Sequence, residues 1–333
     1  MVDRGRRHFM RSSGAIATLA SLGLAGRAGA QGAPLETVKI VTGFPPGGTS
    51  DTLCRRVAEG MKGSAFTKAA IVENKPGAGG QIAVSAMKGA ATDGSILLQT
   101  PASMLMIYPH IYKSLPYNAF TDVTPVTLAC SFDFGFCVGP AVPDSVKDIK
   151  GFLEWAKANP DKLSHCSAGN GTLSHVVMED FKARAGIRIL HVPYQGSPPA
   201  MNDLVAGNVQ VAMDTVTVTK PLIDSGKLRL IAAGTLQRLP AFPDTPTIAE
   251  QGFPGLEAVA WLGVLFPAQT ADDRVKRLSD AVVKVVNDPA MQERFKAVGT
   301  LPRTMPTAEF AAYLKSEDQR WSKVIASSGI RTD

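Results

Sequence analysis

The residues best suited to bind or transform a small molecule lie in turns rich in Gly, Ser, Thr and Asn. The first turn spans residues 44–51 (FPPGGTSD), the second 74–81 (NKPGAGGQ) and the third 167–174 (SAGNGTLS), with a weaker fourth at 193–199. Glycine lets the backbone adopt positive φ and approach a ligand closely, and the first N–H groups of a helix lack intrahelical acceptors. Where such a turn opens a helix, it forms an anion site.

These turns do not match nucleotide-binding loops. The chain has no GxxxxGK[ST] motif, and the GNG at 169–171 lacks a third Gly at the dinucleotide spacing. Because Lys75 is the only basic residue in the four turns, a bound carboxylate would be held by N–H and hydroxyl donors. The alternative is that some of the polar residues only cap their helices, an interaction worth about 1 kcal/mol each. The residues concerned are Ser50, Asp51, Thr172 and Ser174.

Catalytic and metal-binding patterns are weak. There is no G-x-S-x-G elbow and no H-E-x-x-H. A hydrolase using Ser174 and His175 remains an alternative, although adjacency in sequence does not create a nucleophile–base contact. His165, Cys166 and His175 resemble a partial metal cluster, but no fourth ligand is apparent. Asp214 follows an apolar run and is either a buried cleft carboxylate or a helix-initiating or loop residue. We therefore expect no catalytic residue, metal or cofactor.

The first 30 residues have the features of a cleaved export signal. Arginines precede an apolar run at 15–25, and Ala28-Gly29-Ala30 supplies a small-x-small cleavage site. The segment 6–11 (RRHFMR) is similar to a twin-arginine signal, with an ordinary Sec signal as the alternative. Residues 1–30 hold five Arg and one Asp, so their removal changes the net charge from +6 to +2. The mature chain has no basic run with interleaved aromatics, which argues against a nucleic-acid partner.

The four cysteines, at positions 54, 130, 137 and 166, contain no C-x-x-C pair. This excludes a zinc ribbon and a thioredoxin-like motif. An exported protein can form disulfides, but the apolar context of each cysteine is equally consistent with a buried free thiol. The sequence leaves these two alternatives open.

The rest of the chain has the pattern of an α/β protein with two domains. Its 333 residues are 45% hydrophobic and 19% charged, a globular composition. Short apolar runs alternate with amphipathic segments, which predicts a largely parallel sheet with helices on its faces. Strands are expected at 38–42, 70–73, 96–99, 124–130, 134–138, 163–167, 189–192, 209–213, 228–233 and 258–265. Helices are expected at 52–62, 82–90, 149–158, 173–185, 200–206, 219–225, 271–287, 290–297 and 308–328.

No long linker separates the two expected domains, so the chain is expected to cross between them more than once. Pro and Gly residues mark crossings at 136–142 and 254–265. Domain I would then comprise residues 34–137 plus 257–333, and domain II residues 138–256.

Several motifs together resemble those of a known family. They are FPPGG followed by SD at 44–51, ENKPGAGG at 73–80, LPY at 115–117, ANPDKL at 158–163, SAGNGT with SH at 167–175, HVPY at 191–194, and LP with FPDTPT at 239–247. Over residues 35–333 the sequence is similar to the tripartite tricarboxylate transporter receptors, the Bug family of extracytoplasmic solute receptors. The resemblance implies a two-domain periplasmic-binding-protein fold, type II-like, with mixed sheets flanked by helices and the ligand in the interdomain cleft.

The resemblance also implies a function and a set of binding residues. A receptor of this family captures a small organic carboxylate without a cofactor and delivers it to membrane permease subunits. The ligand would be a di- or tricarboxylate, an acidic amino acid or an aromatic acid, and the receptor a periplasmic monomer. The alternative to delivery to a permease is that the protein is the ligand-sensing subunit of a signalling system. The implied ligand-binding residues are Phe44, Gly48, Thr49, Ser50, Ser167, Asn170, Thr172 and Asp214.

Two positions depart from the family pattern. Gln195 follows the HVPY motif where the family often has Lys or Arg, and Met213-Asp214-Thr215 stands where it often has Phe-Asp-Asn. These departures imply that the distal end of the pocket differs from that of other members.

Overall fold

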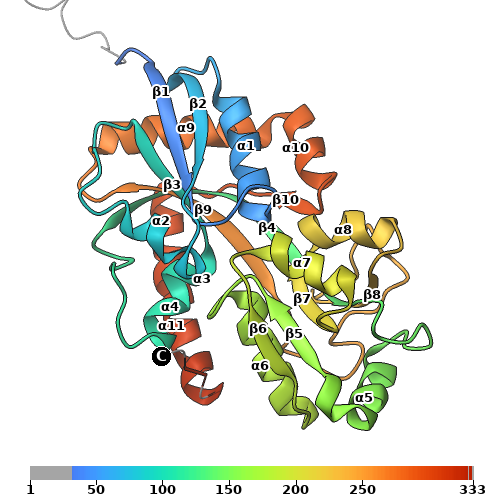
Figure 1. Ribbon diagram of the computed structural model, residues 1–333. Helices are drawn as coiled ribbons and strands as arrows, with labels where there is room; N and C mark the ends of the chain where they lie inside the picture. Colours follow the sequence, from blue (N-terminus) through green and yellow to red (C-terminus); the bar gives the residue numbers. More distant parts are fainter. Residues whose placement is uncertain (1–31, 329, 332–333) are drawn as a thin grey trace, which may run out of the picture. The chain divides into compact units, whose positions relative to one another are not determined.

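A mixed sheet of ten strands organises the protein, which is seen here in a computed structural model (Figure 1). The structure describes residues 32–328, 330 and 331, so the expected export signal at 1–30 lies outside the described residues. From Pro34 onward the chain forms one compact unit. Within the described part of the chain, no helix combines the length and apolar character needed to cross a membrane.

The strands fall into two groups that meet at one long strand, β4. The sheet order is β2-β1-β3-β9-β4-β7-β5-β6, and β8 and β10 also pair with β4. The strand bounds are β1 Leu35–Thr42, β2 Thr67–Asn74, β3 Ile96–Pro101, β4 Val123–Val138, β5 Ser164–Ser167, β6 Leu190–Pro193, β7 Val211–Thr215, β8 Arg229–Ala233, β9 Val259–Pro267 and β10 Thr300–Pro302. Strands β1 to β3 run parallel, as do β5 to β7, whereas β4 and β9 pair antiparallel with their neighbours.

β4 corrects the expectation of two separate strands at 124–130 and 134–138. Its first part, up to Asp133, pairs with β9, and its second part, from Phe134, pairs with β7 and β8. The intervening residues do not break the strand because Val259 and Ala260 of β9 pair with Asp133 and Phe132. We call the strands on the two sides of this switch the first strand group (β1, β2, β3, β9, β10) and the second strand group (β5, β6, β7, β8).

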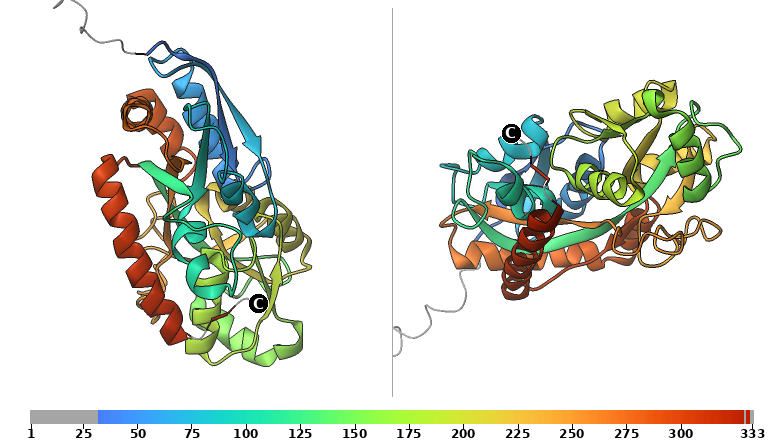
Figure 2. Two further views of the ribbon diagram at one scale, coloured as in Figure 1. Left: turned by 90° about the vertical axis from the view of Figure 1, so that its left-hand side faces the viewer. Right: turned by 90° about the horizontal axis from the view of Figure 1, so that it is seen from below.

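Helices cover the strands on both sides, as Figure 2 shows. Their bounds are α1 Thr49–Met61, α2 Gln81–Ser85, α3 Ala102–Met106, α4 Tyr108–Ile111, α5 Ile149–Ala158, α6 Leu173–Ala185, α7 Ser197–Ala206, α8 Val216–Asp224, α9 Asp272–Asn287, α10 Pro289–Lys296 and α11 Thr307–Ser328, with one-turn 3₁₀ helices at Ala78–Gly80 and Pro160–Lys162. In the first strand group α1 packs on β1, β2 and β3, and α9 and α11 pack on β4. In the second group α6 and α7 pack on β5 and β7.

The expected helix at 82–90 is shorter than predicted. α2 ends at Ser85, after which N–H groups of residues 87, 88 and 90 bond three residues back in successive turns. α3, α4 and β10 were not expected at all. Each has five residues or fewer, too short for a periodic pattern to be visible in the sequence.

Candidate ligand-binding site

A cavity of about 60 Å³ lies where β4 passes from one strand group to the other. It is lined by Phe44, Gly48, Thr49, Ser50, Pro101, Ser103, Met104, Phe132, Phe134, Ala168, Thr172, Leu173, Ser174, Ser197, Asp214, Thr215 and Ala260. Six of the eight residues implied by the family resemblance are among them, namely Phe44, Gly48, Thr49, Ser50, Thr172 and Asp214. Residues more than 160 positions apart thus converge on one small space.

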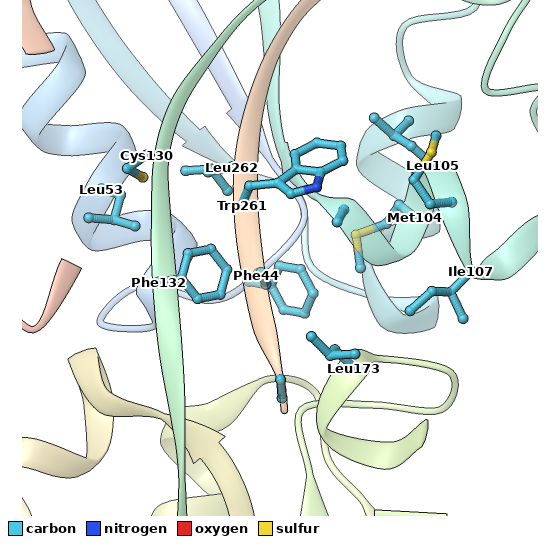
Figure 3. Close-up of a cluster of buried hydrophobic side chains, with 14 of the residues drawn as sticks. Phe44, Leu53, Met104, Leu105, Ile107, Cys130, Phe132, Leu173, Trp261 and Leu262 are labelled. Atoms are coloured by element: carbon cyan, nitrogen blue, oxygen red, sulfur yellow. The ribbon is translucent and has the colours of Figure 1, made fainter. Parts of the chain in front are cut away.

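Apolar side chains make up much of the wall. Figure 3 shows Phe44 and Phe132 with Met104 and Leu173, which reach the same region from the first turn, β4, α3 and α6. Phe134 also lines the cavity, two residues beyond Phe132 on the same face of β4. Beside such apolar side chains the local dielectric is low, so polar contacts are stronger there than at an open surface.

Asp51, in the first turn of α1, ties the glycine-rich turn before it to the helix and to β2. Asp51 accepts hydrogen bonds from the Gly47 N–H (3.0 Å) and the Asn74 amide (2.9 Å), and pairs with Arg55 at 2.9 Å. Burial alone would raise the pKa of Asp51, but the bonds from Arg55, Gly47 and Asn74 lower it below its ordinary value. Asp51 is therefore a buried anion that shapes the turn, and no side chain caps α1.

Ser50 differs from Asp51 because its hydroxyl has no hydrogen-bond partner among the described residues, although only 4% of the residue is exposed. The N–H groups of Thr49 and Ser50 belong to the first turn of α1 and have no intrahelical acceptor. The start of α1 thus presents unpaired donors to the cavity.

The third turn precedes α6, and its polar side chains bond mainly to the turn itself. Thr172 occupies the N-cap position but does not cap the helix, because its hydroxyl donates to the Gly169 carbonyl at 2.7 Å. Its oxygen also lies 3.0 Å from the Ser174 hydroxyl. The first helical N–H, that of Leu173, donates to the Ser103 hydroxyl of α3 at 3.2 Å. The capping interpretation of the Thr172 side chain is therefore wrong.

Two of the implied residues do not line the cavity. The Ser167 hydroxyl is 2.7 Å from His191 Nε2 and bonds within its own turn to Gly169. Asn170 is exposed, and its carbonyl accepts a hydrogen bond from the Tyr112 phenol at 3.0 Å. Ser167 and Asn170 instead support the turn that carries Thr172.

Three histidine rings stack behind the third turn. The His191 ring lies between His165 and His175, with centroids 4.7 and 3.9 Å away. His175 Nδ1 accepts the Gly171 N–H at 3.0 Å, and Glu179 lies 3.3 Å from His165 Nε2. Burial lowers the pKa of His175 to about 4 and that of His191, with a contribution from its charged neighbours, to about 3. The described residues contain no cluster of His, Cys, Asp or Glu arranged to hold a metal ion.

Asp214 is the next-to-last residue of β7 and is 1% exposed. Its Oδ1 accepts the Ser197 hydroxyl at 2.8 Å and the Thr215 N–H at 2.6 Å, whereas its buried Oδ2 has no partner among the described residues. Burial raises the pKa of Asp214 to about 6, against the opposing effect of these hydrogen bonds. Of the alternatives that the sequence left open for Asp214, the structure shows the buried carboxylate.

Four helices begin at the cavity. Thr49, Leu173 and Ser197 are the first residues of α1, α6 and α7, and Thr215 immediately precedes α8; all four line the cavity. Each N-terminus carries the positive end of a helix dipole. Among the described residues that line the cavity, none is Lys, Arg or His. The favourable field for an anion therefore comes from backbone dipoles and not from cationic side chains.

The two strand groups touch around the cavity. The hydroxyls of Thr49 and Thr215 are 2.5 Å apart. A Cβ added to Gly79 would lie 2.6 Å from the Tyr108 hydroxyl and 3.3 Å from the Asn170 carbonyl oxygen, and one added to Gly196 would lie 2.6 Å from Pro45. The loops carrying the glycine-rich turns are therefore in close contact across the site.

Some lining residues were not expected from the sequence. Ser103 and Met104 lie in the short helix α3 after β3, and Phe132 and Phe134 lie inside β4. Ser197 belongs to the fourth turn, which the sequence did single out, and Thr215 follows Asp214. The alternation of Phe132 and Phe134 around Asp133 was the available signal for β4, since it places both rings on one face.

Comparisons with known proteins agree with this fold and site. The profile of the tripartite tricarboxylate transporter family receptor matches residues 53–330. The chain belongs to this family. A UPF0065 protein of Pseudomonas sp. strain P51, from the tcbD–tcbE intergenic region, is 36% identical over 293 residues, 88% of this chain and 86% of that protein. BugT of Bordetella pertussis is 28% identical over 314 residues, 94% of this chain and 95% of BugT.

Several solved structures are also similar to this tripartite tricarboxylate transporter receptor in sequence and in fold. A periplasmic transporter is 36% identical with a TM-score of 0.85, covering 90% of this chain and 99% of its own. Rpa4515 of R. palustris, solved with adipate, is 28% identical with a TM-score of 0.85 at the same coverage. MatC from Rhodopseudomonas palustris, with bound malate, is 27% identical with a TM-score of 0.81, covering 88% and 99%.

These findings confirm the expected α/β periplasmic-binding-protein fold and the Bug-type solute-receptor family, which is periplasmic. The two departures from the family pattern differ in their position relative to the cavity. Thr215 lines the cavity and contacts Thr49, while Gln195 is exposed and is not part of the lining.

Proposed function

We propose that this receptor binds a small organic carboxylate in the cavity at the β4 switch and delivers it to membrane subunits of a tripartite tricarboxylate-type transporter. The convergence of four helix N-termini on a cavity wall without cationic side chains supports this most strongly. Such N-termini bind anions without a counter-charge from Lys or Arg. The relatives solved with adipate and malate hold ligands of the same class.

The proposed binding residues act from both strand groups. The N–H groups of Thr49 and Ser50 and the Ser50 hydroxyl would hold a carboxylate from α1, and Thr172 would contact it from α6. Phe44 and Gly48 would shape the cavity wall, and Asp214 would contribute a further polar group to it. Ser167 and Asn170 would act by supporting the third turn. No cofactor or metal is required for binding of this kind.

A receptor fits the geometry better than a hydrolase. The Ser174 hydroxyl is bonded to Thr172 and to the Ala168 N–H, and His175 Nδ1 is occupied by the Gly171 N–H. Because neither ring nitrogen of His175 has a hydrogen bond to Ser174 in the described residues, the nucleophile–base pair that acyl transfer needs is not formed. We therefore propose a non-enzymatic role.

Calorimetric titration of the purified protein against carboxylates of two to six carbons, each paired with its neutral amide, tests this function. We expect at least one acid to bind and raise the melting temperature, and its amide to bind much more weakly. NMR spectra of the acid should be unchanged after prolonged incubation. Equal binding of acid and amide, or conversion of the acid, would contradict the proposal.

The remaining features of the proposal concern the whole chain. Residues 1–30 would be a cleaved export signal of the twin-arginine type, the receptor would be a monomer, and residues 34–137 plus 257–333 and 138–256 would form its two domains. Replacement of Arg6 and Arg7 by Lys should block export into the periplasm. Unchanged periplasmic yield of that variant would leave only Sec export.

A further inference from the structure

A large groove lies outside the candidate ligand site, at the amino ends of β5 and β6, which run side by side in Figure 1. Its volume is about 570 Å³, against about 60 Å³ for the cavity, and the two share no lining residue. Ser164 and Leu190, the first residues of the two strands, line the groove, whereas Ala168, directly after β5, lines the cavity. Because a strand of this length spans about 13 Å, the groove is a separate feature of the second strand group.

The groove carries an excess of positive charge. Its lining includes Lys162, which ends the 3₁₀ helix before β5, Lys182 of α6, and Arg188 of the segment before β6. Asp161 is the one acidic residue among the described residues of the lining. Lys182 Nζ donates to both carboxylate oxygens of Glu179, at 2.7 and 2.8 Å, but Lys162 and Arg188 are exposed and form no side-chain hydrogen bond or ion pair with described residues. Two unpaired cations in one groove favour the binding of an anion.

An exposed aliphatic side chain lies in the same groove. Leu190, at the start of the edge strand β6, is 69% exposed, and Ile187 beside it is half-buried. A small soluble anion would be bound by the cations alone, without use of an exposed leucine. Cations next to an exposed aliphatic side chain instead match the surface of a bilayer, where anionic headgroups overlie hydrocarbon.

We propose that this groove binds the headgroup of an anionic phospholipid, with the phosphate held by Arg188 and Lys162 and the Leu190 side chain placed among the uppermost acyl carbons. An Arg guanidinium pairs with a phosphate through two parallel hydrogen bonds, and a Lys adds a point charge. The contact keeps the receptor at the membrane surface, a role that rests on the proposed delivery to a membrane transporter. Because it uses no residue of the cavity, the receptor can hold its carboxylate and the lipid together.

Co-sedimentation of the purified protein with lipid vesicles tests this inference. We expect binding to vesicles of phosphatidylcholine mixed with phosphatidylglycerol, and much weaker binding to vesicles of phosphatidylcholine alone. Attraction between the basic residues and an anionic surface is screened over about 8 Å at physiological ionic strength. Binding to the mixed vesicles should therefore weaken as salt is added.

Two pairs of variants locate the contact. Arg188→Gln should weaken binding to the mixed vesicles about fivefold, whereas Lys88→Gln, which removes an exposed cation from the first strand group, should leave it unchanged. Leu190→Ser should also weaken binding, and its control is Ile71→Ser, which removes a 50% exposed side chain from the other edge strand, β2. Arg188→Gln and Leu190→Ser should titrate with a carboxylate as the wild type does, because neither residue lines the cavity.

The outcomes separate this inference from the proposed function. Equal binding to both kinds of vesicle, or full binding by Arg188→Gln or by Leu190→Ser, would overturn the inference and leave the receptor function standing. Binding of glycerol 3-phosphate as tight as that of the mixed vesicles, lost in Arg188→Gln but kept in Leu190→Ser, would also overturn it, because the groove would then take a soluble phosphate. If the wild-type protein binds the mixed vesicles as expected but no carboxylate, the lipid contact is supported and the proposed function fails.

Discussion

Ser50 and Thr172 both line the cavity, yet their hydroxyls are in different states. Ser50 has no hydrogen-bond partner among the described residues, whereas Thr172 donates to the Gly169 carbonyl. A side chain without a protein partner can be truncated without loss of a folded-state bond, so the two positions separate binding from stability.

We expect Ser50→Ala to weaken binding of the carboxylate by roughly 10- to 150-fold, because a hydrogen bond to a charged group contributes about 1.5–3 kcal/mol. Its melting temperature should be unchanged. Thr172→Ala should lose affinity and, in addition, about 1 kcal/mol of stability. Titration and melting curves of both variants check this; a Ser50→Ala protein with full affinity would place the carboxylate elsewhere.

The histidine stack makes stability sensitive to acid. His175 and His191 have folded-state pKa values of about 4 and 3, below the ordinary value of 6.5. The unfolded chain therefore binds protons first, and the stabilisation, complete above pH 6.5, is lost as the pH falls toward 4. Asp214 has the opposite effect on stability. Because burial raises its pKa from 3.8 to about 6, its protonation favours the folded protein as the pH falls from about 6 to 3.8.

Melting temperatures between pH 7.5 and 4.5 should accordingly fall with pH, and fall less steeply in His191→Gln, which removes one ring from the stack. Lys157→Gln, at the last turn of α5, serves as a control for loss of a basic side chain elsewhere. Identical slopes for the wild type and His191→Gln would mean that the stack does not govern acid stability.

At the level of elements, sequence patterns predicted what local interactions determine. The predicted bounds of α5 and α6 agree with the structure, since Asp148 caps α5 and Gly186, with positive φ, ends α6. The union of two predicted strands into β4 was not visible because it depends on pairing with β9, more than 120 residues away. The small helices α3 and α4 form against tertiary neighbours and carry no periodic signal of their own.

The candidate site shows the same division. The glycine-rich turns allowed prediction of Phe44, Gly48, Thr49, Ser50 and Thr172, because the residue types that form such a turn are visible in the local sequence. Which side chains in a turn face the cavity depends on long-range contacts, such as the bond between Ser167 and His191. The lining contributed by α3 and β4 likewise follows from packing.

Gly79 lies where the second turn closely approaches the third, and a side chain at this position would disturb that contact. Its φ is +63°, and a Cβ there would collide with the Tyr108 hydroxyl and press on Asn170. Gly186 has a matching φ of +62° but nothing within 4 Å. Both Ala variants therefore bear the same backbone strain, of order 1–2 kcal/mol, and only Gly79→Ala separates the second and third turns.

We expect Gly79→Ala to bind the carboxylate at least about tenfold more weakly, and Gly186→Ala to bind it normally despite a similar loss of stability. Titration of the two purified variants distinguishes them. Equal affinities would show that contact between the second and third turns is not needed for binding.

For the whole molecule, the contacts between loops of the two strand groups predict that the site opens and closes. The connections that a bending motion would use are β4 near Asp133 and the start of β9 near Val259. Ligand that bridges α1 and α6 favours the closed arrangement. Small-angle scattering should show a smaller radius of gyration with saturating ligand than without it. An unchanged radius with a ligand of measured affinity would argue against the motion.

The continuity of β4 also bears on how the protein loses its structure. One 16-residue strand supplies hydrogen bonds to β9 and β10 at one end and to β7 and β8 at the other. Neither strand group keeps a complete interior once β4 is withdrawn, so the two cannot melt one after the other as separate folding units do. Denaturant titrations followed by fluorescence and by circular dichroism should therefore superimpose as a single cooperative transition, even though the same strand is expected to bend during ligand capture.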